Sequence, residues 1–253
     1  MTEPGKGCEL SHWSASGSIN PPIDHLILKQ MGHRDQMNHT MAAGIASEDG
    51  VKEGLLDHTK PIEDCVKLAL AKYDRMTLMK PWINADQRAK KRTEIPGMVG
   101  HAIEILRPFG KPEFLAGGQQ KITIELTDVR APLIGYLDFY YPEHGLIVDL
   151  KTTGRMPSKI SDAHARQGAV YSAAKSNFEM RFCYSTAREA RLLTQENAAE
   201  RMNEVATIAL NRQRFFDLFE SWEEAARHVT PDYSSFYMSS PAMRDAGRQV
   251  WGF

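Results

Sequence analysis

Cysteine is scarce in this chain, and its few residues are widely separated. Cys8, Cys65 and Cys183 form no Cys-x-x-Cys pair and no Cys/His spacing typical of a zinc site. We therefore expect reduced, structural thiols. No apolar run approaches the roughly 18 residues of a membrane span, and the first residues lack the apolar segment of a signal peptide. Together these absences predict a cytoplasmic protein with no membrane partner.

An excess of charge of one sign is also missing. The formal net charge of −1 creates no global electrostatic field, so any contact with nucleic acid must come from local patches. The dense basic cluster at Arg88, Lys90, Lys91 and Arg92 could bind phosphate, although a solvated helix face is the commoner role of such a run. The chain also has no Gly-x-x-x-x-Gly-Lys-(Ser/Thr) loop, no Gly-x-Ser-x-Gly and no His-Glu-x-x-His, which argues against a nucleotide-driven motor, a triad hydrolase and a zinc peptidase.

The spacing of apolar residues changes along the chain. It follows a helical period up to about residue 106, and then it alternates with a period of two. Helices are predicted at 21–30, 41–56, 61–79, 94–106, 160–176 and 196–219, and strands at 120–126, 133–141, 146–151, 180–186 and 191–194. The first three strands read as an antiparallel meander, and the later strand-helix-strand order indicates an α/β layer.

We therefore predict an α/β fold with a mixed β-sheet flanked by helices and an N-terminal helical portion. The whole of 1–253 is expected to form a single domain. Within it, 1–118 is mainly helical, 119–195 holds the sheet and the chemically informative motifs, and 196–253 is a C-terminal helix with an aromatic tail.

Charged residues stand in the strand pair at 134–153, where a core should be apolar. The alternation of a strand puts Asp149 and Lys151 on one face, and Leu146, Val148 and Leu150 on the other. Asp138 lies in the middle of the preceding run, where an unpaired buried carboxylate would cost several kcal/mol. A divalent cation would compensate this charge.

Two carboxylates and a lysine at adjoining positions suit Mg²⁺, which takes one or two carboxylates and keeps several waters. Asp138 and Asp149, with the Leu150 carbonyl, are the predicted metal ligands, and Lys151 would orient a water or stabilise developing negative charge. One alternative is a metal-dependent hydrolase of another substrate. The other is a plain structural protein in which Lys151 forms a salt bridge with one aspartate. That alternative accounts for one aspartate and leaves the second unexplained.

Two further segments carry candidate site residues. The helix at 160–176 holds His164, Gln167 and Tyr171 along one face. Glu48 lies on the helix at 41–56, whose three glycines permit close approach of another backbone. Taken alone, Glu48 is most simply a solvated helix carboxylate.

These segments together resemble a known family. Gly135-Tyr136-Leu137-Asp138, Val148-Asp149-Leu150-Lys151-Thr152-Thr153 and Gln167-Gly168-Ala169-Val170-Tyr171 are similar in order and spacing to the RecB-type branch of the PD-(D/E)xK nuclease superfamily. Gly44-Ile45-Ala46-Ser47-Glu48 is similar to the upstream helical motif of that family. The motif matches cover about residues 40–175, and their strength lies in four motifs in the same order.

The resemblance implies a restriction-endonuclease-like core that cuts DNA with Mg²⁺ or Mn²⁺. By this similarity Asp138, Asp149 and Glu48 would be catalytic metal ligands, Lys151 the catalytic lysine, and Gln167 with Tyr171 the pair that organises substrate and site. His101 is the rival of Glu48 for the upstream position. A catalytically silent nucleic-acid-binding module and an endonuclease of the same superfamily stay open as alternatives.

The chain departs from the family pattern in its cysteines, and this limits the subgroups that it can resemble. Iron-sulfur members need four cysteines, so three cysteines imply no iron-sulfur cluster. Small stand-alone chains of this type resemble phage or prophage recombination exonucleases of the lambda exonuclease group. The resemblance to this group implies that the substrate is linear duplex DNA ends and that the partner is a single-strand annealing protein. It also implies a homo-oligomer, located in the bacterial cytoplasm if the chain is phage-encoded. Lys29, Arg34 and Arg166 are candidate phosphate contacts without spacing evidence.

Overall fold

The computed structural model describes residues 7–114 and 118–252. The chain divides into two compact units, each built from separate stretches of sequence. One comprises Met1–Gln36, Ile122–Gly135 and Asn197–Phe253, and the other comprises Met37–Lys121 and Tyr136–Glu196. We call them unit 1 and unit 2. The single domain expected for 1–253 stays a prediction from the sequence.

Unit 2 opens with the helical portion expected from the sequence. Its helices are α2 (His39–Leu56), α3 (Ile62–Thr77) and α4 (Ala85–Leu106), followed by a 3-10 turn at Arg107–Phe109. Side chains of Asn38 and Asn84 accept hydrogen bonds from the first free N–H groups of α2 and α4. Because Asn84 caps α4, this helix starts nine residues before the predicted Glu94 and passes through Pro96, carrying the basic cluster within it.

The glycines of α2 allow the close packing that the sequence suggested. A Cβ at Gly50 would lie 2.9 Å from the Cys65 carbonyl oxygen of α3, and a Cβ at Gly54 would lie 2.6 Å from Ile103 Cδ1 of α4. Ala43, Ala46, Val51 and Leu55 of α2 are fully or almost fully buried in the same core. Small residues on α2 therefore set how near α3 and α4 can approach.

The strands within the described residues form two sheets, so the predicted three-stranded meander is wrong. The strands β1 (Gln120–Ile124) and β2 (Leu133–Leu137) make a two-stranded sheet, whereas a four-stranded sheet has the order β3 (Phe139–Tyr141), β4 (Leu146–Thr152), β5 (Glu179–Ser185), β6 (Ala190–Thr194). The predicted run 133–141 is interrupted at Asp138, which separates β2 from β3. Strands β4 and β5 are parallel and the outer pairs are antiparallel, which gives the mixed sheet that was predicted.

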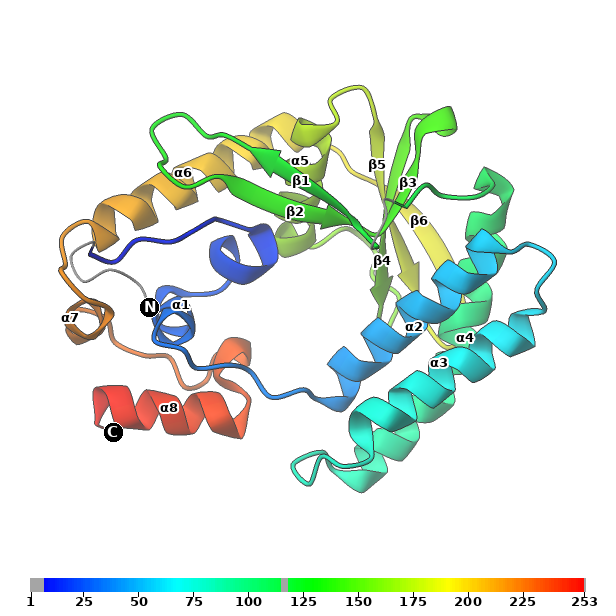
Figure 1. Ribbon diagram of the computed structural model, residues 1–253, viewed down its shortest axis with the longest axis horizontal. Coiled ribbons are helices and arrows are strands. Elements are labelled where there is room, and N and C mark those ends of the chain that lie inside the picture. Colours follow the sequence, from blue (N-terminus) through cyan, green and yellow to red (C-terminus); the bar gives the residue numbers. More distant parts are fainter. Residues whose placement is uncertain (1–6, 115–117, 253) are drawn as a thin grey trace. The chain divides into compact units, whose positions relative to one another are not determined.

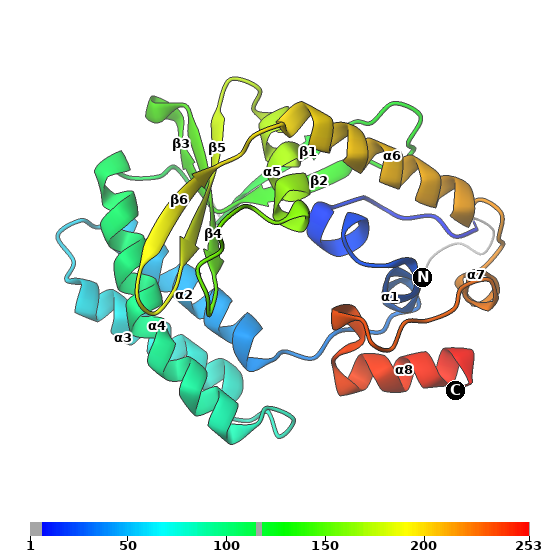
Figure 2. The same ribbon diagram turned by 180° about the vertical axis from the view of Figure 1, so that it is seen from behind.

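The two faces of β4 have different partners, as its alternation predicts. Leu146, Val148 and Leu150 belong to the core formed with the helical portion. The helix α5 (Asp162–Ala174) follows β4 and is capped by Ser161, so it begins two residues after the predicted start at residue 160. Figures 1 and 2 show α2, α3 and α4 together on one side of the four-stranded sheet and α5 on the other. The prediction of an α/β fold with helices flanking a mixed sheet is confirmed.

Unit 1 is built mainly from helices. It contains a π-helical turn (Ala15–Ile19), α1 (Ile23–Gln30), α6 (Ala198–Phe216), α7 (Trp222–Arg227), a 3-10 turn (Phe236–Met238) and α8 (Pro241–Trp251). Leu28, Met238, Met243 and Ala246 form a buried cluster within it. Across residues 7–114 and 118–252, none of the helices has the length and apolar character needed to span a membrane.

Candidate metal-binding site

Asp138 lies at the break between β2 and β3, where its carboxylate replaces a strand partner. The β3–β4 pairing ends at Phe139 opposite Val148. Two residues further along β4, the Leu150 N–H donates to Asp138 Oδ2 at 2.9 Å. The Asp138 side chain, and not a backbone carbonyl, therefore accepts the hydrogen bond from this N–H of β4.

Asp149 and Lys151 emerge side by side from β4, as the alternation predicts. Asp149 is almost completely buried, with 1% of its side chain exposed, and its Oδ2 lies 2.5 Å from Lys151 Nζ. The Lys151 ammonium is thus the close charged partner of this buried oxygen, and this contact raises the pKa of Lys151 against the effect of burial. A carboxylate oxygen has two lone pairs, so one ammonium contact leaves a second lone pair for another ligand.

The helix α5 presents its predicted polar face to Asp149. Gln167 Nε2 donates to Asp149 Oδ1 at 3.0 Å and to the Tyr171 hydroxyl oxygen at 2.7 Å. Gln167 and Tyr171 are one helical turn apart, which is why both reach the same point. Burial, followed by repulsion from Asp149 and Asp138, raises the pKa of Tyr171 well above its ordinary value, so this hydroxyl stays protonated.

Glu48 on α2 joins the site through a residue that the sequence did not single out. Gln119 Nε2 donates to Glu48 Oε1 at 2.9 Å and to Asp138 Oδ1 at 2.6 Å. The helix α2 runs close to the end of β4, since a Cβ at Gly44 would lie 3.5 Å from Thr152 Oγ1. No motif marks Gln119, and 71 residues separate it from Glu48, so a local signal could not have found it.

His101, the rival for the upstream position, has a different environment. It lies on α4, and its Nδ1 faces the Thr186 carbonyl oxygen at 3.4 Å. Glu48, in contrast, interacts electrostatically with Asp149, Asp138 and Lys151. Of these two candidates, Glu48 is therefore the one that shares the electrostatic environment of the aspartates.

The three acids repel one another in a poorly solvated place. Burial, followed by repulsion from Asp149 and Glu48, raises the pKa of Asp138 well above its ordinary value. Burial, followed by repulsion from Asp149 and Asp49, also raises the pKa of Glu48, and the Gln119 hydrogen bond acts against this shift. Burial alone would lower the pKa of Lys151, but Asp149, Asp138 and Glu48 outweigh it and raise that pKa instead.

This charge balance fits a divalent cation. When ionised, three carboxylates face one ammonium, and two negative charges are left over. In the part of the chain that the structure describes, no three acidic, histidine or cysteine side chains form a ready-made metal cage. Mg²⁺ does not need one, because it usually binds one or two carboxylates and completes its octahedron with waters and phosphate oxygens. Asp138 and Asp149 would supply such a pair.

A second unforeseen feature flanks Lys151. Tyr184 lies opposite Lys151 in the β4–β5 register, and its hydroxyl is 2.7 Å from His164 Nδ1. The His164 ring also stacks on Phe182, the register partner of Asp149. Burial, followed by the Lys151 charge, lowers the pKa of His164, so its imidazole is neutral. The polar face of α5 therefore continues from Tyr171 through Gln167 to His164.

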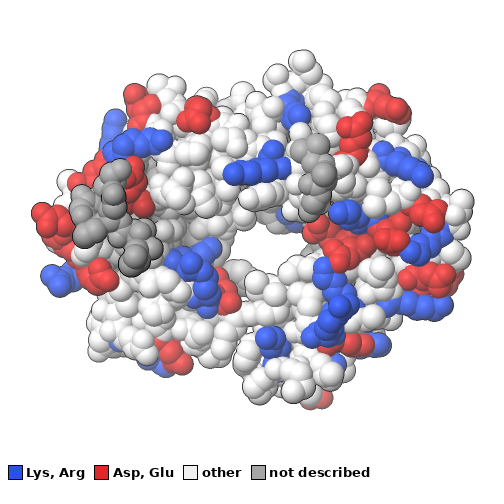
Figure 3. Space-filling model, viewed as in Figure 1, with Lys and Arg blue, Asp and Glu red and all other residues white. Residues whose placement is uncertain are grey.

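The basic cluster on α4 has acidic neighbours. Arg88 and Arg92 both pair with Asp74, and Lys91 pairs with Glu94 at 2.5 Å. Figure 3 shows positive and negative side chains interspersed over the α2–α4 helices. Three of the four cations thus have an acidic neighbour, and two of them share one carboxylate, which favours the solvated-face interpretation of this run.

Of the three candidate phosphate contacts, Lys29 and Arg34 are neighbours in unit 1 and Arg166 belongs to unit 2. The Arg34 guanidinium in unit 1 donates to the Lys29 and His33 carbonyl oxygens, at 2.6 and 2.8 Å. Arg166 lies on α5, directly before Gln167. Of the three, only Arg166 shares an element with a candidate site residue.

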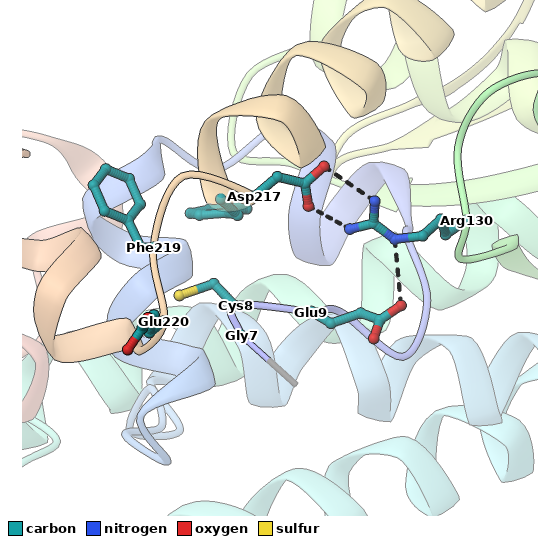
Figure 4. A pocket seen from close by; sticks show the side chains of 8 residues that line it. Gly7, Cys8, Glu9, Arg130, Asp217, Phe219 and Glu220 are labelled. Atoms are coloured by element: carbon teal, nitrogen blue, oxygen red, sulfur yellow. Dashed lines mark hydrogen bonds and ion pairs between the residues drawn. The ribbon is translucent and has the colours of Figure 1, made fainter. Parts of the chain in front are cut away.

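An open pocket of about 680 Å³ lies in unit 1. Its lining includes Cys8, Glu9, Arg130, Asp217 and Phe219 (Figure 4). Arg130 forms ion pairs with Glu9 and Asp217, so its charge is already neutralised. Burial, followed by repulsion from nearby glutamates, raises the pKa of Cys8 to about 11, which keeps the thiol protonated and unreactive.

Comparisons with known proteins give no family for this chain. No protein-family model matches it, and no curated protein does. A solved archaeal structure, described as the crystal structure of SSO0001, aligns over 76% of this chain and 88% of its own length, with 12% identity and a TM-score of 0.35. A similarity at that TM-score carries no argument about this chain.

Proposed function

We propose that this chain is a divalent-metal-dependent deoxyribonuclease that hydrolyses phosphodiester bonds. One observation carries the proposal: Asp138, Asp149, Lys151, Gln167 and Glu48 come from four separate elements into one hydrogen-bonded and electrostatically coupled group. A salt bridge within β4 would require only Asp149 and Lys151. The match in order and spacing to the RecB-type nucleases supports the same conclusion.

The chain's own residues would divide the work as follows. Asp138 and Asp149, with the Leu150 carbonyl and Glu48, would hold Mg²⁺ or Mn²⁺. A bound ion of this kind lowers the pKa of its water and screens phosphate charge. Lys151 stays protonated beside three acids, so it would stabilise the negative charge that develops on the phosphate. Gln167 holds Asp149 from α5, and Tyr171 holds Gln167 in turn.

A cleavage assay tests the proposal. Wild-type protein, Asp149→Ala and Lys151→Ala are compared on linear duplex and single-stranded DNA with Mg²⁺, Mn²⁺ or a chelator. We expect metal-dependent degradation that falls about 100-fold or more in either variant. Glu143→Gln is the matched control, because Glu143 is exposed in the turn at the opposite end of the β3–β4 hairpin.

Two outcomes would contradict the proposal in different ways. Wild-type protein that degrades no DNA with either metal is not a nuclease. Metal-dependent DNA binding without cutting would instead favour the silent nucleic-acid-binding module on the same fold.

We further propose an exonuclease of phage-type recombination or repair, a choice that rests on the resemblance to the lambda exonuclease group. Such an enzyme would degrade linear duplex DNA and spare closed circular duplex, whereas an endonuclease would cut both. A single-strand annealing protein and a homo-oligomer belong to the same proposal. Light scattering, which gives the mass in solution, tests the oligomer.

A further inference from the structure

One amide group spans two of the three acids. Gln119 Nε2 lies 2.9 Å from Glu48 Oε1 and 2.6 Å from Asp138 Oδ1, so both of its N–H bonds are directed at carboxylates. Glu48 belongs to α2, and Asp138 to the break between β2 and β3. Gln119 stands just before β1 and is itself exposed, so its amide connects three segments that are distant in sequence.

The connection leaves room for a metal on both acids. Asp138 Oδ2 is held by the Leu150 N–H and Asp138 Oδ1 by Gln119, so the orientation of this carboxylate is determined at both oxygens. A carboxylate oxygen has two lone pairs, and one hydrogen bond uses only one of them. The second lone pair of Asp138 Oδ1 can still bind a cation or a water that the cation holds.

Glu48 depends on the amide even more strongly. Within the described residues, Gln119 is the only hydrogen-bond donor to the Glu48 carboxylate. Repulsion from Asp149 and Asp49 would otherwise push this flexible side chain toward solvent. The Gln119 bridge therefore opposes the separation of the acids that their own charges favour.

We propose that Gln119 is a positioning residue, which holds Glu48 and Asp138 in the arrangement that binds the divalent metal. The inference rests on the proposed metal-dependent function. Hydrogen bonds to the ligands of a metal typically alter metal affinity by about 10-fold to 100-fold when they are removed. Gln119 acts through the two acids, so its loss should weaken metal binding more than it slows the reaction at saturating metal.

Gln119→Met tests this directly, because methionine has a similar length and no N–H donor. Mn²⁺ binding to the full chain is measured by calorimetry without DNA, and cleavage is then measured across a Mn²⁺ series. We expect Mn²⁺ affinity about 10-fold weaker and a half-saturating Mn²⁺ concentration raised to match. The rate at saturating Mn²⁺ should change by less than about threefold. Gln120→Met is the matched control, since Gln120 is the next residue and makes no contact with either acid that the structure records.

The results separate this inference from the function on which it rests. Unchanged Mn²⁺ affinity in Gln119→Met, with a wild type that binds Mn²⁺ and cuts DNA, overturns only the role of Gln119. Tighter binding also overturns it, because the amide would then be a competitor that the metal displaces. A wild type that neither binds Mn²⁺ nor cuts DNA overturns both. Thermal melts of Gln119→Met and Gln120→Met check that both variants are folded, so that weaker Mn²⁺ binding in Gln119→Met alone reports the lost bridge.

Discussion

Glu48→Gln should stabilise the metal-free protein while weakening its affinity for metal. Glutamine keeps an oxygen that accepts the Gln119 hydrogen bond, and it removes one of three mutually repelling charges. Functional sites commonly reduce stability in this way, and relieving such a site typically gains about 0.5–2 kcal/mol. A gain of about 1 kcal/mol would raise the Tm of a chain of this size by about 2–4 °C.

The extra stability of Glu48→Gln over wild type should increase with pH. The folded-state pKa of Glu48 lies above its ordinary value of 4.5, so the folded protein holds this proton more tightly than the unfolded chain does. The corresponding stability is complete below about pH 4.5 and is lost as the pH rises through the folded-state pKa. Glu48→Gln has no such loss. Its advantage over wild type should therefore be absent near pH 4 and full at pH 8.

Bound metal should make wild type more stable than Glu48→Gln. A ligand at 100 times its Kd stabilises the folded state by about 2.7 kcal/mol. If the variant binds tenfold more weakly, the same metal concentration stabilises it by only about 1.4 kcal/mol. The difference exceeds the gain of about 1 kcal/mol, so wild type becomes the more stable protein.

Urea unfolding at pH 4 and pH 8, with and without Mg²⁺, measures all three effects. A variant that is less stable than wild type at pH 8 without metal would show that the Glu48 charge does not destabilise the folded protein. So would an equal gain at both pH values, because the gain would then not come from an ionised Glu48.

The remaining predictions concern packing in each unit, and both are measured by urea or thermal unfolding. Gly97→Ala should lower the free energy of unfolding by about 3 kcal/mol, because its Cβ would lie 2.2 Å from the Ala187 carbonyl oxygen. Its control is Gly44→Ala, whose nearest contact would be at 3.5 Å and which should be neutral or stabilising by up to about 1 kcal/mol. Similar values for the two variants would contradict this prediction. Gln213→Ala should cost about 2 kcal/mol, because the buried amide accepts from the Arg130 N–H at 2.7 Å and donates to the Asp128 carbonyl oxygen at 3.0 Å. The exposed Asn211→Ala is its control on the same helix, and an equal effect of both variants would count against the argument.

The parts of the site that depend on local geometry could be predicted from the order of the residues. A strand alternates its side chains, so Asp149 and Lys151 had to share one face of β4 while Val148 and Leu150 entered the core. A helix repeats every 3.6 residues, so Gln167 and Tyr171 had to meet on one face of α5. The helical portion before the mixed sheet followed from the same two periods.

Where distant segments meet depends on long-range packing. Local alternation cannot say which strands pair, and so 133–141 was predicted as one strand of a meander although Asp138 divides it between two sheets. Nor could any local pattern bring Gln119 to Glu48, 71 residues away, or Tyr184 to His164. These contacts come from burial of apolar faces across the whole of unit 2, which places polar side chains together that have no relation in sequence. The periods of the chain therefore decide which face each residue occupies, whereas long-range packing decides what that face meets.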